Sequence, residues 1–287
     1  MSADFSNITI LGGGLLGGSL AMALSTLDPA PRVRLWARKT ATTDLARALG
    51  ISGATSELAE AVKQADLLVL AVPVGSMPEL LAQAVVSGLP SACLVTDVGS
   101  VKRAPHETLP PVLATGGMDF IGSHPMAGSE RVGIAAARAR MFDGAACLLT
   151  NDQQVPTLRA QALERFWQSV GCRTTWLSAA AHDALVARIS HLPHIIAASA
   201  ARICLLDPTA GGFGGGGLRD TTRISSGNPD MWAEILIENR EALLGPLRES
   251  ALDLSAILAH LESGDQEAVR QWLATAKHQR DLLQPFC

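Results

Sequence analysis

Residues 7–19 read NITILGGGLLGGS, and this stretch decides the fold of the first half of the chain. The β-branched run NITIL predicts a strand, and the apolar residues 20–27 predict a helix. Between them Gly12, Gly14 and Gly17 have the G-x-G-x-x-G spacing. The first glycine of this motif permits a tight turn, the second lets the backbone approach a pyrophosphate, and the third lets helix and strand pack closely. We therefore predict a dinucleotide-binding turn.

The cofactor contacts are expected at the carboxyl ends of the predicted strands, because ligands of such sheets bind there. Residues 67–72 form the continuous apolar run of a parallel strand buried on both faces, and Pro73 ends it. The helix after the glycine turn points its first amides at the phosphates. The predicted contacts are Gly12, Gly14, Leu15, Leu16, Gly17, Arg38, Lys39, Val72 and Pro73.

The end of the second predicted strand, residues 33–37, points to the cofactor type. An acidic residue is expected there to bond the ribose 2′-hydroxyl of NAD. This chain instead has Arg38 and Lys39. Because two cations suit a 2′-phosphate, we predict a preference for NADP centred on Arg38, with NAD as a possible second cofactor. The alternative is that both cations belong to a solvated turn.

Strand and helix patterns alternate up to Ser178, and only helical patterns follow. Further strands are predicted at 94–98, 118–121, 146–150 and 174–177, and helices at 44–49, 56–64, 77–86, 135–141 and 155–170. Later helices are predicted at 182–206, with a kink at Pro193, and at 231–244, 247–261 and 265–283. The chain therefore predicts an α/β Rossmann-type nucleotide-binding domain at residues 1–178, followed by an all-α helical domain at residues 179–287.

The stretch Gly122 to Glu130, GSHPMAGSE, lies late in the first half. Its glycines and proline predict a loop rather than a helix or strand. A loop beside a cofactor is where a general base is useful, so we predict His124 as the catalytic residue.

Three further groups of polar residues are candidates for the site. Asp97, Ser100 and Lys102 follow a predicted strand, but position alone leaves open whether Asp97 is a turn residue and Ser100 a helix cap with Lys102 exposed. Arg219 and Arg223 are four residues apart, so they can grip a carboxylate from one helical face. The alternative is a solvated pair. His191 and His194 share a face of a straight helix, either as core residues or beside a substrate.

Composition excludes several classes of function. The net charge of −4 gives no electrostatic reason to expect nucleic acid or an anionic membrane as partner. Five scattered cysteines indicate neither a metal site nor a disulfide framework, and the start of the chain lacks a signal pattern, so we expect a cytoplasmic protein. Hydrophobic residues make up 48% of the chain, and its long helices are richer in Leu, Ile and Ala than one small bundle needs. We therefore expect a homodimer through the helical half.

The motifs together resemble those of the prephenate and arogenate (cyclohexadienyl) dehydrogenases of tyrosine biosynthesis. The matching pieces occur in the family's order and span most of the chain: GGGLLGGS, DVGSVK, GSHPMAGSE, SHLPH, GGGLRDTTRI and NPDMW. The resemblance implies a nucleotide-binding domain followed by a helical dimerisation domain. It also implies the oxidative decarboxylation of prephenate or arogenate to 4-hydroxyphenylpyruvate or tyrosine.

The resemblance also implies roles for single residues. His124 would bond the ring hydroxyl and assist its deprotonation, and Ser100 would help to orient His124 and the substrate. Arg223 would bind a substrate carboxylate with support from Arg219. His191 and Glu130 would lie around the pocket.

Two other functions remain open at this stage. The chain could be a dehydrogenase of the β-hydroxyacid or imine-reductase kind, which would have a catalytic Lys or Asp at the start of the long helix, where His182 and Asp183 stand. It could also be a non-catalytic NADP-sensing protein, although the concentration of polar candidates argues against that. Because the chain has no tyrosine, a mechanism built on a tyrosine acid is excluded.

Overall fold

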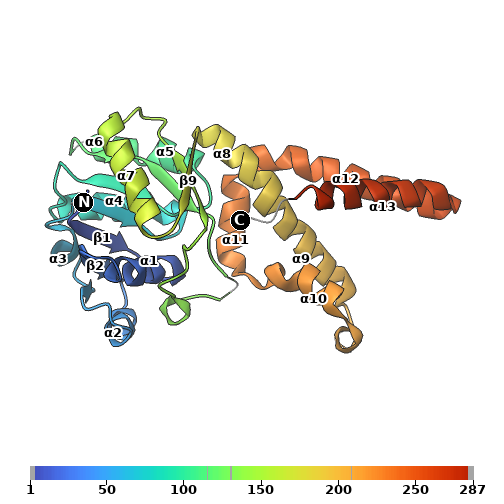
Figure 1. Ribbon diagram of the computed structural model, residues 1–287, viewed down its shortest axis with the longest axis horizontal. Helices are drawn as coiled ribbons and strands as arrows, with labels where there is room; N and C mark the ends of the chain where they lie inside the picture. The colour runs from blue at the N-terminus through green and yellow to red at the C-terminus, as the bar shows by residue number, and fades with distance from the viewer. Residues whose placement is uncertain (1–3, 115, 130, 208, 284–287) are drawn as a thin grey trace. The chain divides into compact units, whose positions relative to one another are not determined.

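The computed structural model describes residues 4–114, 116–129, 131–207 and 209–283. The chain divides into two compact units, one that ends at Asn239 and one that begins at Arg240. The first unit holds the strands and the helices up to the end of α11, and the second holds the two last helices (Figure 1).

A six-stranded parallel sheet forms the centre of the first unit, as predicted. Its strands are β1 Asn7–Leu11, β2 Arg32–Trp36, β3 Ala54–Thr55, β4 Leu67–Leu70, β5 Leu94–Asp97 and β6 Asp119–Phe120. They lie in the order β3-β2-β1-β4-β5-β6, and every paired neighbour is parallel. The strand order reverses between β1 and β4, which is where sheets of this kind bind nucleotides. The predicted Rossmann-type fold is confirmed.

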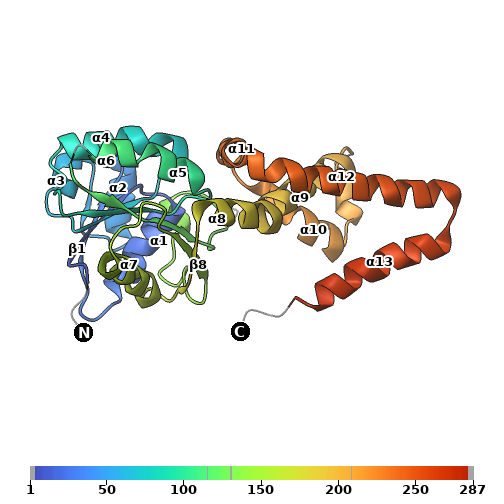
Figure 2. The ribbon, with the colours of Figure 1, turned by 90° about the horizontal axis from the view of Figure 1, so that it is seen from above.

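Helices cover both faces of this sheet (Figure 2). Their bounds are α1 Leu15–Ser25, α2 Thr40–Ala48, α3 Leu58–Val62, α4 Met77–Val86, α5 Arg103–Thr108, α6 Pro110–Ala114 and α7 Thr157–Ser169, with a 3-10 turn η1 Val74–Ser76 before α4. One apolar core joins α1, α2 and α7 to the sheet, and a second joins α3, α4, α5 and α6 to it. The helix predicted at 135–141 is wrong, because that segment holds only the 3-10 turn η2 Ile134–Ala136.

A second sheet follows, and it corrects the prediction of a loop at GSHP. Residues Gly122–Pro125 form the strand β7, which pairs antiparallel with β8 Ala146–Thr150, and β8 pairs parallel with β9 Arg173–Leu177. The proline is tolerated because β7 is an edge strand of this sheet. Close packing requires a glycine at position 122, since a Cβ at Gly122 would lie 2.4 Å from Thr150 Oγ1. Only the residues after Pro125 form the predicted loop.

The carboxylate of Asp97 fixes the point where the chain changes sheets. Ile121 still bonds to β5 through its amide, and the next residues pair with β8 instead. Asp97, the last residue of β5, accepts the amide of Ser123 at 3.0 Å and the ammonium of Lys102 at 2.5 Å. Lys102 is completely buried, so the alternative in which it is exposed is wrong.

The rest of the first unit is helical among the described residues. Its elements are α8 Ala179–Val186, the π-helical turn η3 Ala187–His191, α9 Leu192–Cys204, η4 Ala210–Phe213, α10 Gly216–Thr222, η5 Arg223–Ser226 and α11 Pro229–Glu238. The predicted long helix is thus interrupted just before Pro193. Proline lacks the amide that would continue the regular ladder, and the wider turn accommodates this loss.

The stretch Ala179–Cys204 is long and apolar enough to cross a membrane by length and composition alone. However, its His182, Asp183 and His191 are completely or almost completely buried and hydrogen-bonded to other elements of the first unit. These contacts are those of a core helix, which is what the polar residues in this stretch predict.

The second unit is a helical hairpin of α12 Arg240–Ser263 and α13 Gln266–Asp281 (Figure 1). Gly264 has a φ of +68°, a conformation that favours glycine, and it follows the last residue of α12. Asp265 then caps α13 by accepting the amide of Ala268.

Candidate active site

The glycine turn has the shape that a pyrophosphate needs. Gly12 has a φ of +129°, and a Cβ there would lie 2.2 Å from the carbonyl oxygen of Ala71 beyond β4. A Cβ at Gly17 would lie 2.0 Å from the carbonyl oxygen of Gly12. At Gly14 a Cβ would meet no atom within 4 Å, and no described side chain caps α1 there. The turn is therefore tight where it must pack and open where a phosphate would bind the first amides of α1.

The other predicted cofactor residues border the same turn. Val72 Cγ1 would lie 3.2 Å from a Cβ at Gly12, and Pro73 follows it on the surface. On the other side, a Cβ at Gly13 would touch the side chains of Ala37 and Thr42. Arg38 and Lys39 are exposed between those two residues. Leu15 and Leu16 form the first turn of α1. The structure thus brings the predicted cofactor residues to one edge of the sheet.

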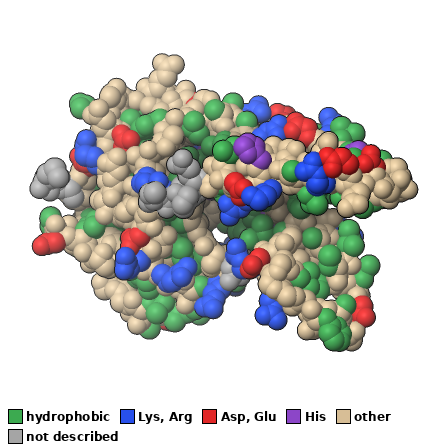
Figure 3. Space-filling model, turned by 45° about the vertical axis from the view of Figure 1, so that its right-hand side comes forward, with side chains coloured by type: hydrophobic (Ala, Val, Ile, Leu, Met, Phe, Trp, Pro, Cys, Tyr) green, Lys and Arg blue, Asp and Glu red, His purple; other side chains and the backbone are tan. Residues whose placement is uncertain are grey.

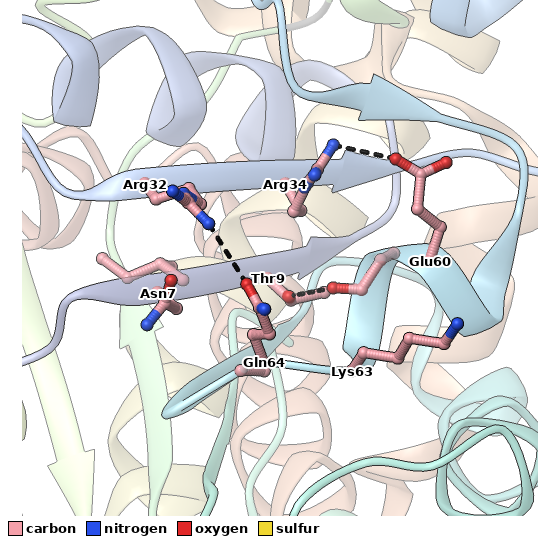
Figure 4. Close-up of a pocket in the computed structure, with 10 residues that line it drawn as sticks. Asn7, Thr9, Arg32, Arg34, Glu60, Lys63 and Gln64 are labelled. Atoms are coloured by element: carbon pink, nitrogen blue, oxygen red, sulfur yellow. Dashed lines mark hydrogen bonds and ion pairs between the residues drawn. The ribbon is translucent and has the colours of Figure 1, made fainter.

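A small cavity of roughly 160 Å³ lies at the opposite edge, where β1 and β2 begin (Figure 4). Two arginine side chains that line the cavity have partners within the chain: Arg34 pairs with Glu60 at 2.9 Å, and Arg32 donates to Gln64 at 3.1 Å. The helix α1 follows the glycine turn, and its first amides lie at the other edge of the sheet. This cavity therefore does not belong to the dinucleotide site.

The predicted base His124 stands in a chain of three buried side chains. Its Nδ1 lies 2.9 Å from Nε2 of His182, and Nδ1 of His182 lies 2.7 Å from Oδ1 of Asp183. Asp183 also accepts the backbone amides of Lys102 and Arg103, at 2.7 and 3.0 Å. The chain therefore joins β7 to the start of α8 and to the loop after β5.

These contacts determine where the protons of the chain lie. A carboxylate can only accept, so His182 carries its proton on Nδ1 and presents a bare Nε2. The bare Nε2 accepts a proton only from Nδ1–H of His124. His124 is then left with an unprotonated Nε2, to which no described residue bonds. An imidazole in this state is ready to take a proton from a ligand.

Burial keeps both imidazoles neutral. It holds the pKa of His124 well below its ordinary value, and the nearby His182 and Lys102 lower it further. Burial also lowers the pKa of His182, against the opposite effect of Asp183. For Asp183 burial alone would raise the pKa, but hydrogen bonds from His182 and two backbone amides outweigh it and lower the pKa. At neutral pH the group is an ionised carboxylate with two neutral rings.

His191 and His194 have different surroundings, although both contact Trp232. His191 is completely buried, and its Nδ1 lies 2.9 Å from Nδ2 of Asn239. The ring of His194 stacks on Trp232, with centroids 3.5 Å apart. Burial lowers the pKa of His191 to about 4 and also lowers that of His194. Both rings are therefore neutral at neutral pH.

The remaining predicted site residues lie in several places. Ser100 is half-buried between β5 and α5 and makes no described hydrogen bond to His124. Arg219 lies on α10 and Arg223 begins η5; both are exposed, on elements that pack against α9. Glu130 lies outside the described residues.

Sequence reasoning missed the roles of His182, Asp183 and Asn239 in this site. The first two were visible only as the start of a helix, and their partner His124 is far away in the sequence. Asn239 had a clearer signal, because it stands with Trp232 and Ile235 on the apolar face of a predicted amphipathic helix. A polar residue in that position requires a buried partner.

The sheet order, the glycine turn at the reversal point and a neutral imidazole near the carboxyl end of β5 define a dinucleotide-dependent dehydrogenase. Residues 20–176 match the family model of the prephenate dehydrogenase nucleotide-binding domain, and residues 178–275 match that of the prephenate dehydrogenase dimerization domain. The chain belongs to the prephenate dehydrogenase family, which confirms the resemblance of its motifs.

Three relatives illustrate the similarity. The chain is 33% identical to the prephenate dehydrogenase of Bacillus subtilis, over 96% of this chain and 76% of that one. It is 33% identical to the cyclohexadienyl dehydrogenase of Zymomonas mobilis, over 91% and 90%. The structure of Aquifex aeolicus prephenate dehydrogenase with hydroxyphenyl propionate and NAD+ has a TM-score of 0.87 and 27% identity, over 98% of this chain and 99% of that one. The matching family model assigns a nucleotide-binding domain to this chain.

The contrast between Gly17 and Gly14 can be tested with alanine. We expect Gly17→Ala to lower the free energy of unfolding by about 1–3 kcal/mol, because its Cβ collides with backbone. Gly14→Ala should change stability by less than about 1 kcal/mol. It should nevertheless weaken dinucleotide binding by about tenfold or more, because the methyl group stands where the phosphates approach. Urea denaturation and cofactor titration measure the two effects, and equal stability losses would contradict this assignment.

Proposed function

We propose that this protein catalyses the oxidative decarboxylation of prephenate or arogenate to 4-hydroxyphenylpyruvate or tyrosine. The observation that carries the proposal is the hydrogen-bonded chain from His124 through His182 to Asp183, from which an unprotonated Nε2 on His124 follows. The names of the Bacillus subtilis and Zymomonas mobilis relatives support the substrate class. An assay of reduced cofactor with each substrate tests the proposal and identifies the preferred one.

His124 acts as the base in this reaction. Its Nε2 takes the proton of the ring hydroxyl as the hydride leaves the same carbon. A nicotinamide held at the glycine turn would supply the hydride acceptor. The bond to the ring carboxylate breaks, its electrons complete the aromatic ring, and carbon dioxide leaves. The proton on His124 then returns to the phenolate oxygen. The ionised Asp183 stabilises the transient imidazolium through His182.

The other predicted residues hold the substrate. We assign Arg223, with Arg219, to a substrate carboxylate, because guanidinium groups bind carboxylates bidentately. His191 and Glu130 lie around the pocket in this proposal, and Ser100 lies beside the reacting hydroxyl. Positioning both ends of a rigid ring supplies much of the rate enhancement in such a reaction.

The role of His124 predicts a loss of turnover without a loss of cofactor affinity. His124→Asn should lower kcat by about two to four decades. Asp183→Asn should lower it by about one to three decades, because the proton positions lose their anchor. Near-normal turnover of the His124 variant would refute the assignment.

The pKa of His124 also predicts the pH dependence. Because that pKa lies below 6.5, the base stays unprotonated at neutral pH. We expect kcat/KM to be level around pH 7 and to fall only as the pH drops below 6.5. A kcat/KM that already falls above pH 7 as the pH is lowered would contradict this expectation.

We propose NADP as the preferred cofactor, with NAD as a second one. Arg38 and Lys39 are exposed at the end of β2, beside Ala37, which borders the glycine turn. Neither makes a described ion pair, and neither position holds the acid that an unphosphorylated ribose prefers. A 2′-phosphate would receive charge-assisted hydrogen bonds there.

Arg38→Asp tests this preference. It should raise KM for NADP by about tenfold to a hundredfold, because it removes a charge-assisted bond and adds a repulsive charge. KM for NAD should change little or fall. Lys63→Asp is the matched control, since Lys63 is an exposed cation at the opposite edge of the sheet (Figure 4). A wild-type enzyme that uses NAD as well as NADP, or better, would overturn the proposal.

The chain contains a dimerization domain. We propose a cytoplasmic homodimer in which residues 1–178 bind the dinucleotide and residues 179–287 supply substrate contacts and the dimer interface. Hydrophobic side chains remain exposed on the helical part of the chain (Figure 3). Those of α12 and α13 include Leu252, Leu254, Leu258, Leu261 and Leu273. Such a concentration of apolar surface is typical of an interface.

Light scattering should give twice the 30.0 kDa of one chain at micromolar concentration. The double variant Leu258→Glu with Leu261→Glu should shift the protein toward monomers, because charges are poorly tolerated in an apolar interface. Val86→Glu changes an even more exposed apolar residue, on α4, and should leave the dimer intact. A monomeric wild type would contradict the proposal.

A further inference from the structure

The Nε2 atom of His191 is buried and has no hydrogen-bond partner in the described part of the chain. The ring is completely buried, so water does not replace a partner as it would at the surface. Buried polar atoms are almost always bonded, and the exceptions need an explanation. The other nitrogen, Nδ1, lies 2.9 Å from Nδ2 of Asn239.

The orientation of the Asn239 amide is fixed by a second contact. Its Nδ2 donates to the backbone carbonyl oxygen of Asp183 at 2.9 Å. Because a carbonyl only accepts, the amide nitrogen and not the amide oxygen faces this pair of neighbours. One N–H of Asn239 is directed to Asp183, and the other is directed to Nδ1 of His191.

This amide determines which nitrogen of His191 carries the proton. Nδ1 accepts from Asn239, so it is unprotonated. Burial lowers the pKa of His191 to about 4, so the ring is neutral and holds one proton at pH 7. That proton is on Nε2. The atom without a partner is therefore an N–H donor that waits for an acceptor.

We infer that Asn239 is a positioning residue that holds His191 as a hydrogen-bond donor toward an anionic or carbonyl oxygen of the substrate. The inference rests on the proposed function, since it gives His191 a defined partner in that site. Sequence gave Asn239 no role, and the two histidines of the long helix could not be told apart. The structure separates them, because Asn239 fixes the ring of His191, whereas His194 is held by stacking on Trp232.

Asp183 thereby sets two imidazoles in opposite roles. Its carboxylate bonds His182, which leaves His124 with a bare Nε2 that accepts a proton. Its backbone carbonyl orients Asn239, which leaves His191 with an Nε2 that donates one. The two rings thus offer one proton acceptor and one hydrogen-bond donor, which are the groups that a substrate with a hydroxyl and a carboxylate requires.

The proton position can be observed directly in the wild-type protein. Spectra of protein with ¹⁵N-labelled histidine distinguish a proton on Nδ1 from one on Nε2, and His191→Asn identifies the signals of His191. We expect a proton on Nε2 and a bare Nδ1 throughout pH 6–8. Addition of hydroxyphenyl propionate, the ligand of the Aquifex aeolicus enzyme, should shift the Nε2–H signal. A proton on Nδ1 would overturn the inference, even if the protein proved inactive with prephenate and arogenate.

Two variants separate positioning from a purely structural role. Asn239→Leu and Asn239→Asp both lose the bond to the Asp183 carbonyl. Leucine also frees His191 to carry its proton on either nitrogen, so KM for the substrate should rise by about tenfold or more, with kcat less affected. Aspartate accepts from Nδ1 and charges the ring, which keeps the donor on Nε2, so KM should stay within about threefold of the wild type.

Asn228→Asp is the matched control, because it introduces the same charge at the start of α11 and keeps the helix cap. It should change neither the spectrum nor KM. If Asn239→Leu and Asn239→Asp raise KM to the same extent, or if neither does, Asn239 has no positioning role. If no variant and no wild-type protein turns over either substrate but the Nε2–H signal responds to the ligand, the inference stands and the proposed reaction fails.

Discussion

The buried ion pair between Asp97 and Lys102 is the interaction on which the site depends. One carboxylate at the end of β5 receives the ammonium of Lys102, the amide of Gly99 and the amide of Ser123, the neighbour of His124. The ammonium also donates to two backbone carbonyls. A buried pair repays the loss of water only when its remaining bonds are satisfied, as they are here. Since the amide of Lys102 bonds to Asp183, the same loop holds β7 and α8 together.

The features that sequence predicted are those set by local contacts. The glycine turn is encoded in residues 12–17. The apolar pattern predicted the bounds of α4, which buries one face, and of β8, which is a continuous apolar run buried on both faces. The strand β7 could not be predicted, since its glycine and proline favour a loop and only pairing with β8 overrides them. His124 was found through its motif, but its partner His182 lies 58 residues away and no pattern joins the two. Sequence position alone also left open whether Lys102 is exposed, and the structure shows it buried in an ion pair with Asp97.

Neutral imidazoles are the common element of the site, and burial produces them. Contact with water would let each ring exchange its proton between the two nitrogens. In a buried site with one fixed hydrogen-bond partner, the proton stays on one nitrogen. The carboxylate of Asp183 supplies the only described negative charge in direct contact with this group. A single residue, Asp183, therefore orders side chains from β7 and α8 through its carboxylate, and from η3 and the end of α11 through its backbone carbonyl.

The π-helical turn Ala187–His191 places one extra residue in the helix that leads from α8 to α9. In a regular helix each residue advances the direction of the side chains by about 100°. All of α9 is therefore out of phase with α8 by nearly one residue. His194 and Ala197 face inward as a result, and Ile196 and Ile203 face outward. Deleting one residue of this turn would rotate the inward-facing and the outward-facing sides of α9 together, because both follow the same backbone.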